Sequence, residues 1–186
     1  EYYNVTDFYR LRYSEDRIRL LDFERSAGQV FDPKQSVITD DGLLLGVRNK
    51  NVTYLTNTEG SVTAFVQEGA LWTYTQNNGK FAQVFDFRKA AKGDFRDSHT
   101  EHDIKLLSVE DDGDVNFMVY GYMNRGNHEG YCGAGIYHYN HDQNVVEEKV
   151  FIPTTESFEF LKSDLGTLSY VNKKNQLFLL LSGSLY

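Results

Sequence analysis

The sequence predicts an all-β fold of repeated four-stranded antiparallel blades that form part of a β-propeller. The first observation behind this prediction is an internal repeat of about 64 residues, which indicates stacked supersecondary units. The second is that short apolar stretches alternate with turn sequences along the whole chain, while no segment shows a convincing helical period. The alternative fold is a β-sandwich or an irregular β-meander.

Each copy of the repeat joins an aromatic-rich strand to an apolar strand through a polar turn. The copies are 16 residues long and occupy 8–23, 72–87 and 137–152. The first two copies both end in Asp-Phe, at Asp22-Phe23 and Asp86-Phe87. Because a unit of this size cannot bury its own apolar face, neighbouring units must pack together.

Turn sequences set the order of the strands. Residues 40–42 (Asp-Asp-Gly) and 77–79 (Asn-Asn-Gly) are hairpin signals, because these residue types accept the positive φ that tight turns require. The connectors at 88–103 and 153–164 are polar, and 155–162 suits a turn or two of helix. The expected strands are 8–13, 17–23, 43–47, 52–56, 61–67, 71–75, 81–87, 104–109, 115–122, 132–139, 145–152, 168–171 and 177–181.

These strands are predicted to form a single repeat domain, 1–186. Its first and last blades are partial, because the chain starts and stops within a blade. Because a blade is incomplete at each end, we expect the chain to be a segment of a longer protein. Residues 1–36 would supply the last two strands of one blade, 37–87 and 104–152 two whole blades, and 165–186 the first two strands of a further blade.

The apolar run 177–181 (Leu-Phe-Leu-Leu-Leu) is typical of a strand covered on both faces and paired on both edges. Its outer partner would be missing unless the hairpin 8–23 supplied it, and three blade equivalents are too few to close a ring. We therefore expect a homo-oligomer in which a second copy fills the gap. The residues expected to be mostly buried are Phe23, Phe87, Val119, Ile136, Val150 and Leu179.

Composition excludes several classes of function. A net charge of −8 argues against nucleic acid, whose binding requires clustered Lys and Arg, and against an anionic membrane surface. The single cysteine, Cys132, excludes an intramolecular disulfide and a cysteine-based zinc site. No apolar run approaches the ~18 residues of a membrane span, so we expect no direct membrane insertion by this segment. No cofactor is expected.

Residues 102–153 contain two distinctive sequence motifs, 119–126 (Val-Tyr-Gly-Tyr-Met-Asn-Arg-Gly) and 128–130 (His-Glu-Gly). This segment, about a third of the chain, resembles a stretch in large, uncharacterised, membrane-anchored proteins of Gram-positive gut anaerobes. The resemblance implies an extracellular or cell-surface location, with anchoring through a region outside this segment, and it implies no known activity. A cytoplasmic location is the alternative.

The most unusual stretch is 123–135 (MNRGNHEGYCGAG), which joins two expected strands. Polar, glycine-rich loops between strands are where scaffold proteins place binding residues. We expect Arg125, His128, Glu129 and Tyr131 to form a binding surface. The competing interpretation is a wide loop whose glycines only satisfy backbone geometry. A Cys132–His128 nucleophile is not favoured, because Cys132 begins an apolar strand.

A pair of histidines is a weak candidate for a metal site. His99 and His102 lie three residues apart, with Glu101 and Asp103 beside them. Imidazole and carboxylate ligands suit several transition metals. The favoured interpretation is that these are solvated or capping residues in a polar connector, so no metal site is expected.

Two classes of function remain. The favoured hypothesis is a non-catalytic binding or scaffold module that presents inter-strand loops to a protein, peptide or glycan. The alternative is a glycan hydrolase or lyase that uses loop carboxylates such as Glu101, Asp103 and Glu129, which would have to converge in one pocket.

Overall fold

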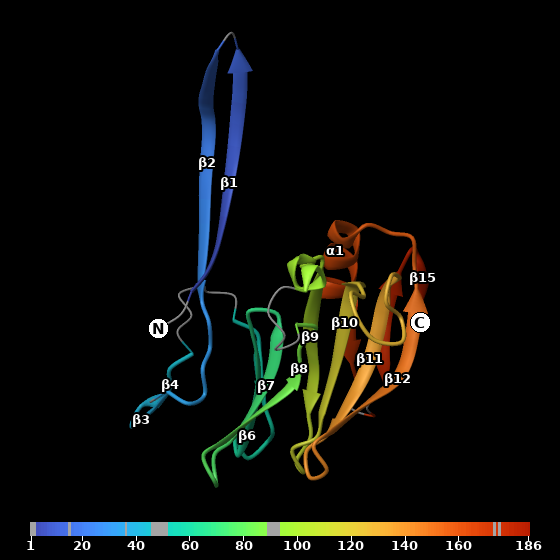
Figure 1. Cartoon of the computed structure of the whole chain (residues 1–186). Helices are drawn as coiled ribbons and strands as arrows, with labels where there is room; N and C mark the ends of the chain where they lie inside the picture. Colours follow the sequence, from blue (N-terminus) through green and yellow to red (C-terminus); the bar gives the residue numbers. More distant parts are fainter. Residues whose placement is uncertain are drawn as a thin grey trace. The chain divides into compact units, whose positions relative to one another are not determined.

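The computed structural model describes residues 3–14, 16–35, 37–45, 52–88, 94–172, 174 and 176–186. Most of these residues lie in short antiparallel sheets, so the predicted all-β class is confirmed (Figure 1). The chain divides into two compact units, Glu1–Lys50 and Asn51–Tyr186. The boundary between them falls inside the segment 37–87 that we expected to be one blade.

The first unit contains two separate hairpins. Strands β1 (Tyr3–Ser14) and β2 (Arg17–Gln29) form a long two-stranded sheet whose tight turn pairs Ser14 with Arg17. Strands β3 (Ile38–Thr39) and β4 (Gly42–Leu43) form a short one around the expected Asp-Asp-Gly turn. The expected strand 43–47 therefore contributes only its first residue, and Val47 lies outside the described residues.

Phe23, on β2, was expected in the core but has 43% of its surface exposed. Its ring packs only locally, 5.0 Å from the ring of Tyr9 on the paired strand. The reason for the wrong prediction is that β1–β2 is a two-stranded sheet, and almost all of its described side chains face solvent.

The second unit begins with a four-stranded meander. Its strands are β5 (Tyr54–Thr56), β6 (Val62–Gln67), β7 (Ala70–Thr75) and β8 (Lys80–Phe85), paired in chain order. A second four-stranded meander follows with the same topology: β9 (His102–Val109), β10 (Val115–Tyr122), β11 (Cys132–Asn140) and β12 (Val145–Pro153).

The second hairpins of the two meanders, which correspond to two copies of the internal repeat, share the position of a register shift and the length of their turn. In β7–β8 the register shifts just before Trp72, which then pairs with Gln83. In β11–β12 it shifts just before Tyr137, which then pairs with Glu148. Both hairpins close with turns of four residues, and the last residue of each turn, Gly79 or Asn144, has a positive φ. The β1–β2 hairpin does not share this geometry, because its turn is shorter.

The C-terminal part departs from the expected pair of strands. The helix α1 (Phe158–Leu168) takes in Leu168, which we expected in a strand, and is longer than the expected turn or two. A three-stranded sheet follows: β13 (Ser169–Val171), β14 (Leu177–Leu181) and β15 (Ser184–Leu185). The edge of β14 that we expected to lack a partner pairs with β15, at Leu180–Leu185 and Leu181–Ser184.

Strand β10 lies at the centre of the second unit because its two faces belong to two different cores. Val115, Phe117 and Val119 point into a core shared with the first meander, including Leu71 and Phe87. The alternate residues, Met118 and Tyr120, point into a second core. That second core is completed by α1, β14 and β11 through Leu161, Leu165, Leu179, Leu181, Ala134 and Ile136.

Of the expected core residues, Phe87, Val119, Ile136 and Leu179 are buried, whereas Val150 is 47% exposed. Val150 pairs with Ile136 but lies on β12, the outermost strand of its sheet. An apolar residue on an edge strand extends beyond the layer that covers the central strands. The alternation of the sequence indicates which face a residue is on and not how near it is to an edge.

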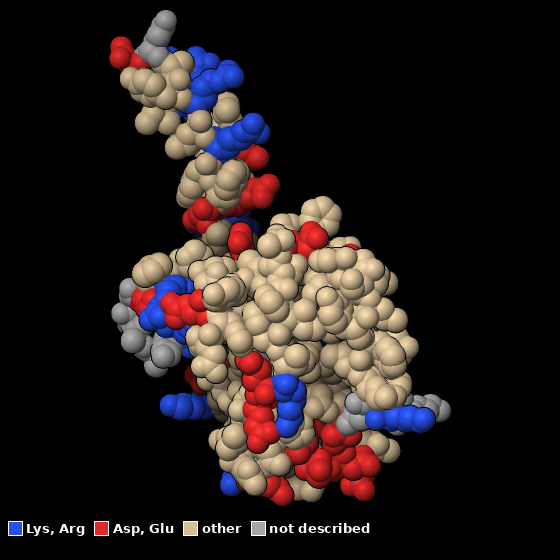
Figure 2. Space-filling view, turned by 90° about the vertical axis from the view of Figure 1, so that its right-hand side faces the viewer, with Lys and Arg blue, Asp and Glu red and all other residues tan. Residues whose placement is uncertain are grey.

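A short 3₁₀ helix, η1 (Phe95–Ser98), lies in the connector between the two meanders, and Asp94 caps its N-terminus. The described part of the chain contains no helix with the length and apolar character to cross a bilayer. Acidic side chains gather at the lower end of the second unit in Figure 2, the end where the β9–β10 and β11–β12 turns lie in Figure 1.

Candidate functional site

A cleft of about 430 Å³ lies in the second unit, where the end of β8 approaches the β10–β11 loop and strands β11 and β12. This volume falls in the usual range for small-molecule sites. Its apolar walls are Phe85, Phe87, Met123 and Val146. Its polar side chains are Asp86, Arg125, Asn127, His128, Tyr137 and Glu148.

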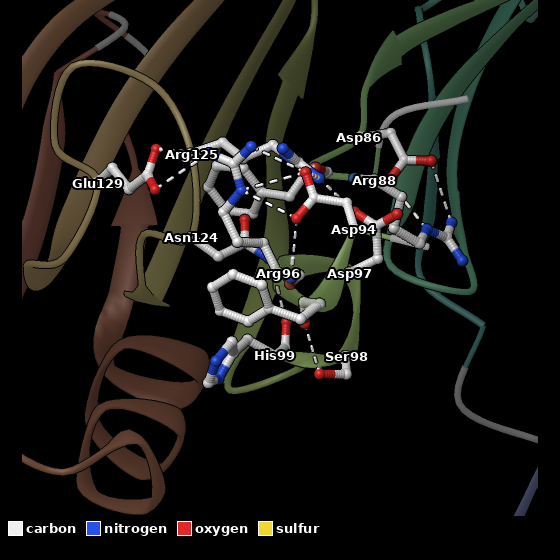
Figure 3. Close-up of polar contacts among 12 residues, drawn as sticks. Asp86, Arg88, Asp94, Arg96, Asp97, Ser98, His99, Asn124, Arg125 and Glu129 are labelled. Atoms are coloured by element: carbon white, nitrogen blue, oxygen red, sulfur yellow. Dashed lines mark hydrogen bonds and ion pairs between the residues drawn. The ribbon is translucent and has the colours of Figure 1, made fainter. Parts of the chain in front are cut away.

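Arg125 is the most constrained polar group of the cleft, with only 7% of its side chain exposed. Its Nε donates to the carbonyl oxygen of Phe87, so the arginine holds the end of the first meander against the β10–β11 loop. Its Nη2 lies 2.5 Å from Asp97 Oδ1 and 2.9 Å from Asp94 Oδ2 (Figure 3). The pKa of Arg125 is raised, chiefly by the hydrogen bond to Asp97.

The remaining nitrogen of this guanidinium, Nη1, is buried and has no hydrogen-bond partner among the described residues. A buried donor without a partner is costly, and native structures leave few of them. Arg125 lines the cleft, but Nη1 itself has almost no accessible surface and is not a contact point for a bound ligand. The sign of a binding site is the cleft as a whole, whose apolar walls carry a few polar side chains.

A second arginine fixes Asp94, one of the two acids that hold Arg125. Arg96 pairs with Asp94 at 2.8 Å and with Glu129 Oε1 at 3.1 Å. The side-chain hydrogen bond from Arg96 is the main cause that lowers the pKa of Asp94 below its usual value. Asn124 completes this support by donating from Nδ2 to the Arg96 carbonyl oxygen at 2.9 Å (Figure 3).

Glu148, on β12, supplies the acceptor side of the cleft. Its Oε1 lies 2.8 Å from His128 Nε2, and its Oε2 accepts from the Tyr137 hydroxyl at 3.2 Å. Burial, with the nearby charge of Glu148, raises the pKa of Tyr137, so the hydroxyl keeps its proton and donates it. His128 is held flat against Phe151, with ring centroids 3.8 Å apart.

The other carboxylate of the cleft, Asp86, is fully engaged. Its Oδ1 accepts from the Arg88 backbone N–H at 2.8 Å and from Arg88 Nε at 3.0 Å. Its Oδ2 accepts from Gln83 Nε2 at 3.0 Å and from Arg88 Nη2 at 3.1 Å. These four bonds leave Asp86 poorly suited to act as a nucleophile or a proton carrier.

The structure brings together two of the four residues expected to form a binding surface. Arg125 and His128 both line the cleft. Glu129 does not line it and instead pairs with Arg96. Tyr131 is 62% exposed and also lies outside the lining. Cys132 begins β11, as expected, and is partly buried.

The carboxylates considered for a glycan-active enzyme do not line the cleft. Asp103 is on β9, where its Oδ2 accepts from the Tyr120 hydroxyl at 3.4 Å. Glu101 is exposed in the connector, and its carbonyl oxygen accepts from the Tyr122 N–H at 2.7 Å.

The two histidines considered for metal binding lie in different environments. His102 packs edge-on against Phe87, with ring centroids 4.7 Å apart, whereas His99 is exposed beside Tyr122. Within the described ranges, no group of three or more His, Cys, Asp or Glu side chains is arranged to hold a metal ion.

Sequence reasoning missed Glu148, Tyr137 and Asp86 as members of the site. Glu148 and Tyr137 are regular strand positions, and nothing in the local sequence shows that they lie opposite the β10–β11 loop. The one available signal was Asp86-Phe87, the repeated Asp-Phe pair at the end of the second repeat copy. Only the second Asp-Phe pair lines the cleft.

No protein-family model matches the chain, and comparisons with curated proteins and with solved structures return no significant match.

Proposed function

We propose that this protein is a non-catalytic binding module that takes part of a protein, peptide or glycan ligand into the cleft between β8 and the β10–β12 region. The observation that carries the proposal is the cleft of about 430 Å³, whose wall includes the Arg125 guanidinium held in place by Asp94 and Asp97. Preformed concave sites with apolar walls and a few convergent polar groups are typical of ligand binding.

The polar groups of the cleft support binding better than catalysis. Asp86 accepts four hydrogen bonds, from Gln83 and Arg88. Glu148 accepts two, from His128 and Tyr137. A glycan hydrolase requires one carboxylate free to attack or to activate water, and a second that exchanges a proton. The enzyme alternative would rest on Glu148 with a second group that the described cleft does not offer.

The proposal includes a larger architecture. Two meanders of equal strand order, which share a core through one face of β10, support propeller blades as the proposed arrangement. An extracytoplasmic location, with anchoring through a region outside 1–186, rests on the resemblance of residues 102–153 alone. A membrane-surface fraction enriched in the full-length protein would support it.

The cleft can be blocked without altering the core. Asn127 is exposed at its rim, so Asn127→Trp should fill the opening while leaving the fold intact. The matched control is Thr155→Trp, at an exposed position between β12 and α1. Both variants and the parent chain would be applied to glycan and peptide arrays, with thermal denaturation as the check on folding.

We expect the parent and the control to retain the same ligands and Asn127→Trp to lose them. Equal binding by all three proteins would show that the cleft is not the binding site. Release of reducing ends or unsaturated products from any bound glycan, abolished by Glu148→Gln, would favour the enzyme alternative instead.

A further inference from the structure

The ionic groups around the cleft carry more negative than positive charge. Among the described residues that line the cleft or belong to the ion pairs of its lining, three arginines face five carboxylates. Four of the carboxylates lie within ion-pair distance of an arginine. The fifth, Glu148, pairs with no arginine or lysine in the described part of the chain. The residues counted are Arg88, Arg96, Arg125, Asp86, Asp94, Asp97, Glu129 and Glu148.

Glu148 is also within reach of a ligand. Its Oε1 lies 2.8 Å from His128 Nε2, and its Oε2 lies 3.2 Å from the Tyr137 hydroxyl oxygen. One N–H and one O–H satisfy these contacts, so neither partner needs a positive charge. The side chain of Glu148 is 29% exposed, and each carboxylate oxygen has room for a further hydrogen bond. A donor on a ligand in the cleft can therefore contact this carboxylate.

The guanidinium in the cleft wall does not cancel this negative charge. The side chain of Arg125 is only 7% exposed, and both Asp94 and Asp97 pair with it. The connected ion pairs hold two positive and three negative charges, on Arg96, Arg125, Asp94, Asp97 and Glu129. Charge complementarity therefore favours a cationic ligand in this cleft, and an anion would meet repulsion.

The walls of the cleft require that the same ligand has an apolar body. Phe85 packs against Phe87 and Tyr137, with ring centroids 4.9 Å and 5.6 Å apart, and Met123 and Val146 extend the apolar surface. A methylene chain that ends in a positive charge can cover such a surface while its head group contacts a polar site. Aromatic faces also attract cations. This combination describes the side chains of lysine and arginine.

The acceptor arrangement distinguishes between these two side chains. A guanidinium is recognised best by a carboxylate that offers both oxygens to its planar fork. Both oxygens of Glu148 already accept a hydrogen bond from the protein. An ammonium is a compact charge with rotatable donors, so one free acceptor position on the carboxylate is enough. The amide oxygen of Asn127, at the rim, offers another acceptor.

We infer that the cleft binds the side chain of a lysine residue on a peptide partner. Its methylene stem covers the apolar wall at Phe85 and Val146, and its ammonium donates to Glu148. The inference rests on the proposed function, since it assigns a ligand class to the same cleft. An arginine side chain and a neutral ligand are the alternatives that the test separates.

The test uses the full chain and blocked pentapeptides that differ only at the central residue. That residue would be lysine, norleucine, Nε-acetyl-lysine, arginine or glutamate. Saturation-transfer NMR and calorimetry at fixed ionic strength, with peptide up to about 10 mM, detect dissociation constants of about 1 mM. We expect the lysine peptide to bind. The norleucine and Nε-acetyl-lysine peptides should bind at least about tenfold more weakly, because they lack the charged donor.

A pair of charge-matched variants tests the role of Glu148. Glu148→Gln keeps the shape of the side chain and removes its charge, so it should weaken binding of the lysine peptide by about tenfold. Glu147→Gln changes the net charge by the same amount, but Glu147 pairs with Lys149 and lies outside the cleft lining. It should bind the lysine peptide like the parent chain. Equal losses in the two variants would reveal a general attraction of cations to an acidic protein and would overturn the inference.

The remaining outcomes distinguish the inference from the proposed function. Tighter binding of the arginine, glutamate or norleucine peptide, at a cleft that Asn127→Trp blocks, would overturn the lysine assignment and leave the binding module standing. Lysine-peptide binding that Asn127→Trp leaves unchanged would overturn both. If the lysine peptide does not bind at about 10 mM, the inference is wrong, and the glycan and peptide arrays still decide the proposed function.

Discussion

Lys105, on β9, lies with its Nζ 2.8 Å from the carbonyl oxygen of Ser169, the residue that follows α1. The same ammonium donates to the carbonyl oxygens of Leu165 and Gly166, at 3.0 and 2.8 Å. The last carbonyls of a helix lack partners within the helix, and a cation there also interacts favourably with the helix dipole. Lys105 therefore ties α1 to the central sheet.

We predict that Lys105→Met lowers the free energy of unfolding by about 2 kcal/mol, because several hydrogen bonds from a charged donor are lost together. Urea denaturation followed by circular dichroism would measure this. The control is Lys149→Met on β12, where the lysine forms an exposed ion pair with Glu147. A loss in the control as large as in Lys105→Met would contradict the capping role.

Phe87 should be one of the sensitive aromatic residues of the repeat. Its buried ring packs against Phe85 and His102, and its carbonyl oxygen anchors Arg125. Phe87→Ala should cost about 3–5 kcal/mol, because a large side chain leaves a cavity in a core that cannot fully collapse. Phe95→Ala, at a ring that is mostly exposed, should change the stability little. Calorimetric melting curves that coincide for the two variants would refute the core assignment.

The burial of His102 should make the free energy of unfolding depend on pH. Burial lowers the pKa of this histidine in the folded protein, against the opposing effect of Asp103 and Asp86 and with a smaller lowering effect of Arg88. Unfolded histidine titrates near 6.5, so below about pH 6.5 the unfolded chain binds more protons than the folded one. Stability should therefore fall as the pH drops from about 7 towards the lower folded pKa, by about 1.4 kcal/mol for each unit of the pKa difference.

The variant His102→Phe should remove this part of the pH dependence. In the parent chain, His102 Nδ1 is buried without a hydrogen-bond partner among the described residues, so replacing the imidazole by a phenyl ring breaks no hydrogen bond at that atom. The matched control is His99→Phe, at an exposed histidine three residues away. Unfolding free energies measured from about pH 7 to 5 would decide the point, and an unchanged slope in His102→Phe would contradict it.

The sequence predicts much of the strand order because turn chemistry is local. Gly79 and Asn144 occupy the same place in two repeat copies and both adopt a positive φ, a conformation that these residue types favour. Burial is less predictable. Val119 and Val150 have the same side chain in similar apolar strands, and only the first is buried, because one lies on a central strand and the other at a sheet edge.

The candidate site is predictable only in part. The composition of the β10–β11 loop indicates Arg125 and His128, but the partners of these residues come from strands far away in sequence. Glu148 reaches His128 only through the β11–β12 pairing, and Phe87 reaches Arg125 only through the packing of two meanders. Tertiary contacts of this kind leave no pattern in the local sequence.

Two glycines should respond to alanine in opposite directions. Gly166 lies in α1, and the nearest atom to an added Cβ is the Tyr120 hydroxyl oxygen at 3.4 Å, an ordinary contact. Gly166→Ala should therefore stabilise the fold by about 0.5–1 kcal/mol, because glycine costs a helix interior that much. Gly121 on β10 has a φ of +117°, and an added Cβ would lie 2.3 Å from the Glu101 carbonyl oxygen.

Gly121→Ala should accordingly destabilise the second unit severely, since both the backbone conformation and the space are unsuitable for a side chain. The melting temperatures of the two variants would be compared with that of the parent. Two shifts of the same sign would show that the α1–β10 packing differs from the structure.

The last prediction concerns association through the β1–β2 hairpin. A two-stranded hairpin alone is at best marginally stable in water, and unpaired strand edges promote pairing with another chain. Leu11 and Leu20 face each other across this hairpin, and both are more than half exposed. Eight further large apolar side chains of the hairpin are exposed: Tyr3, Val5, Phe8, Tyr9, Tyr13, Ile18, Leu21 and Phe23.

We expect two copies of the chain to bury these hairpins against each other, giving a particle of about twice the 21.4 kDa chain mass in light scattering at high micromolar concentration. The double variant Leu11→Lys, Leu20→Lys places two positive charges on the same face and should yield a monomer. Leu44→Lys, at an exposed residue of the first unit outside the hairpin, should associate like the parent. A parent chain that stays at 21.4 kDa throughout would rule out self-association. A double variant that still dimerises would move the interface away from the hairpin.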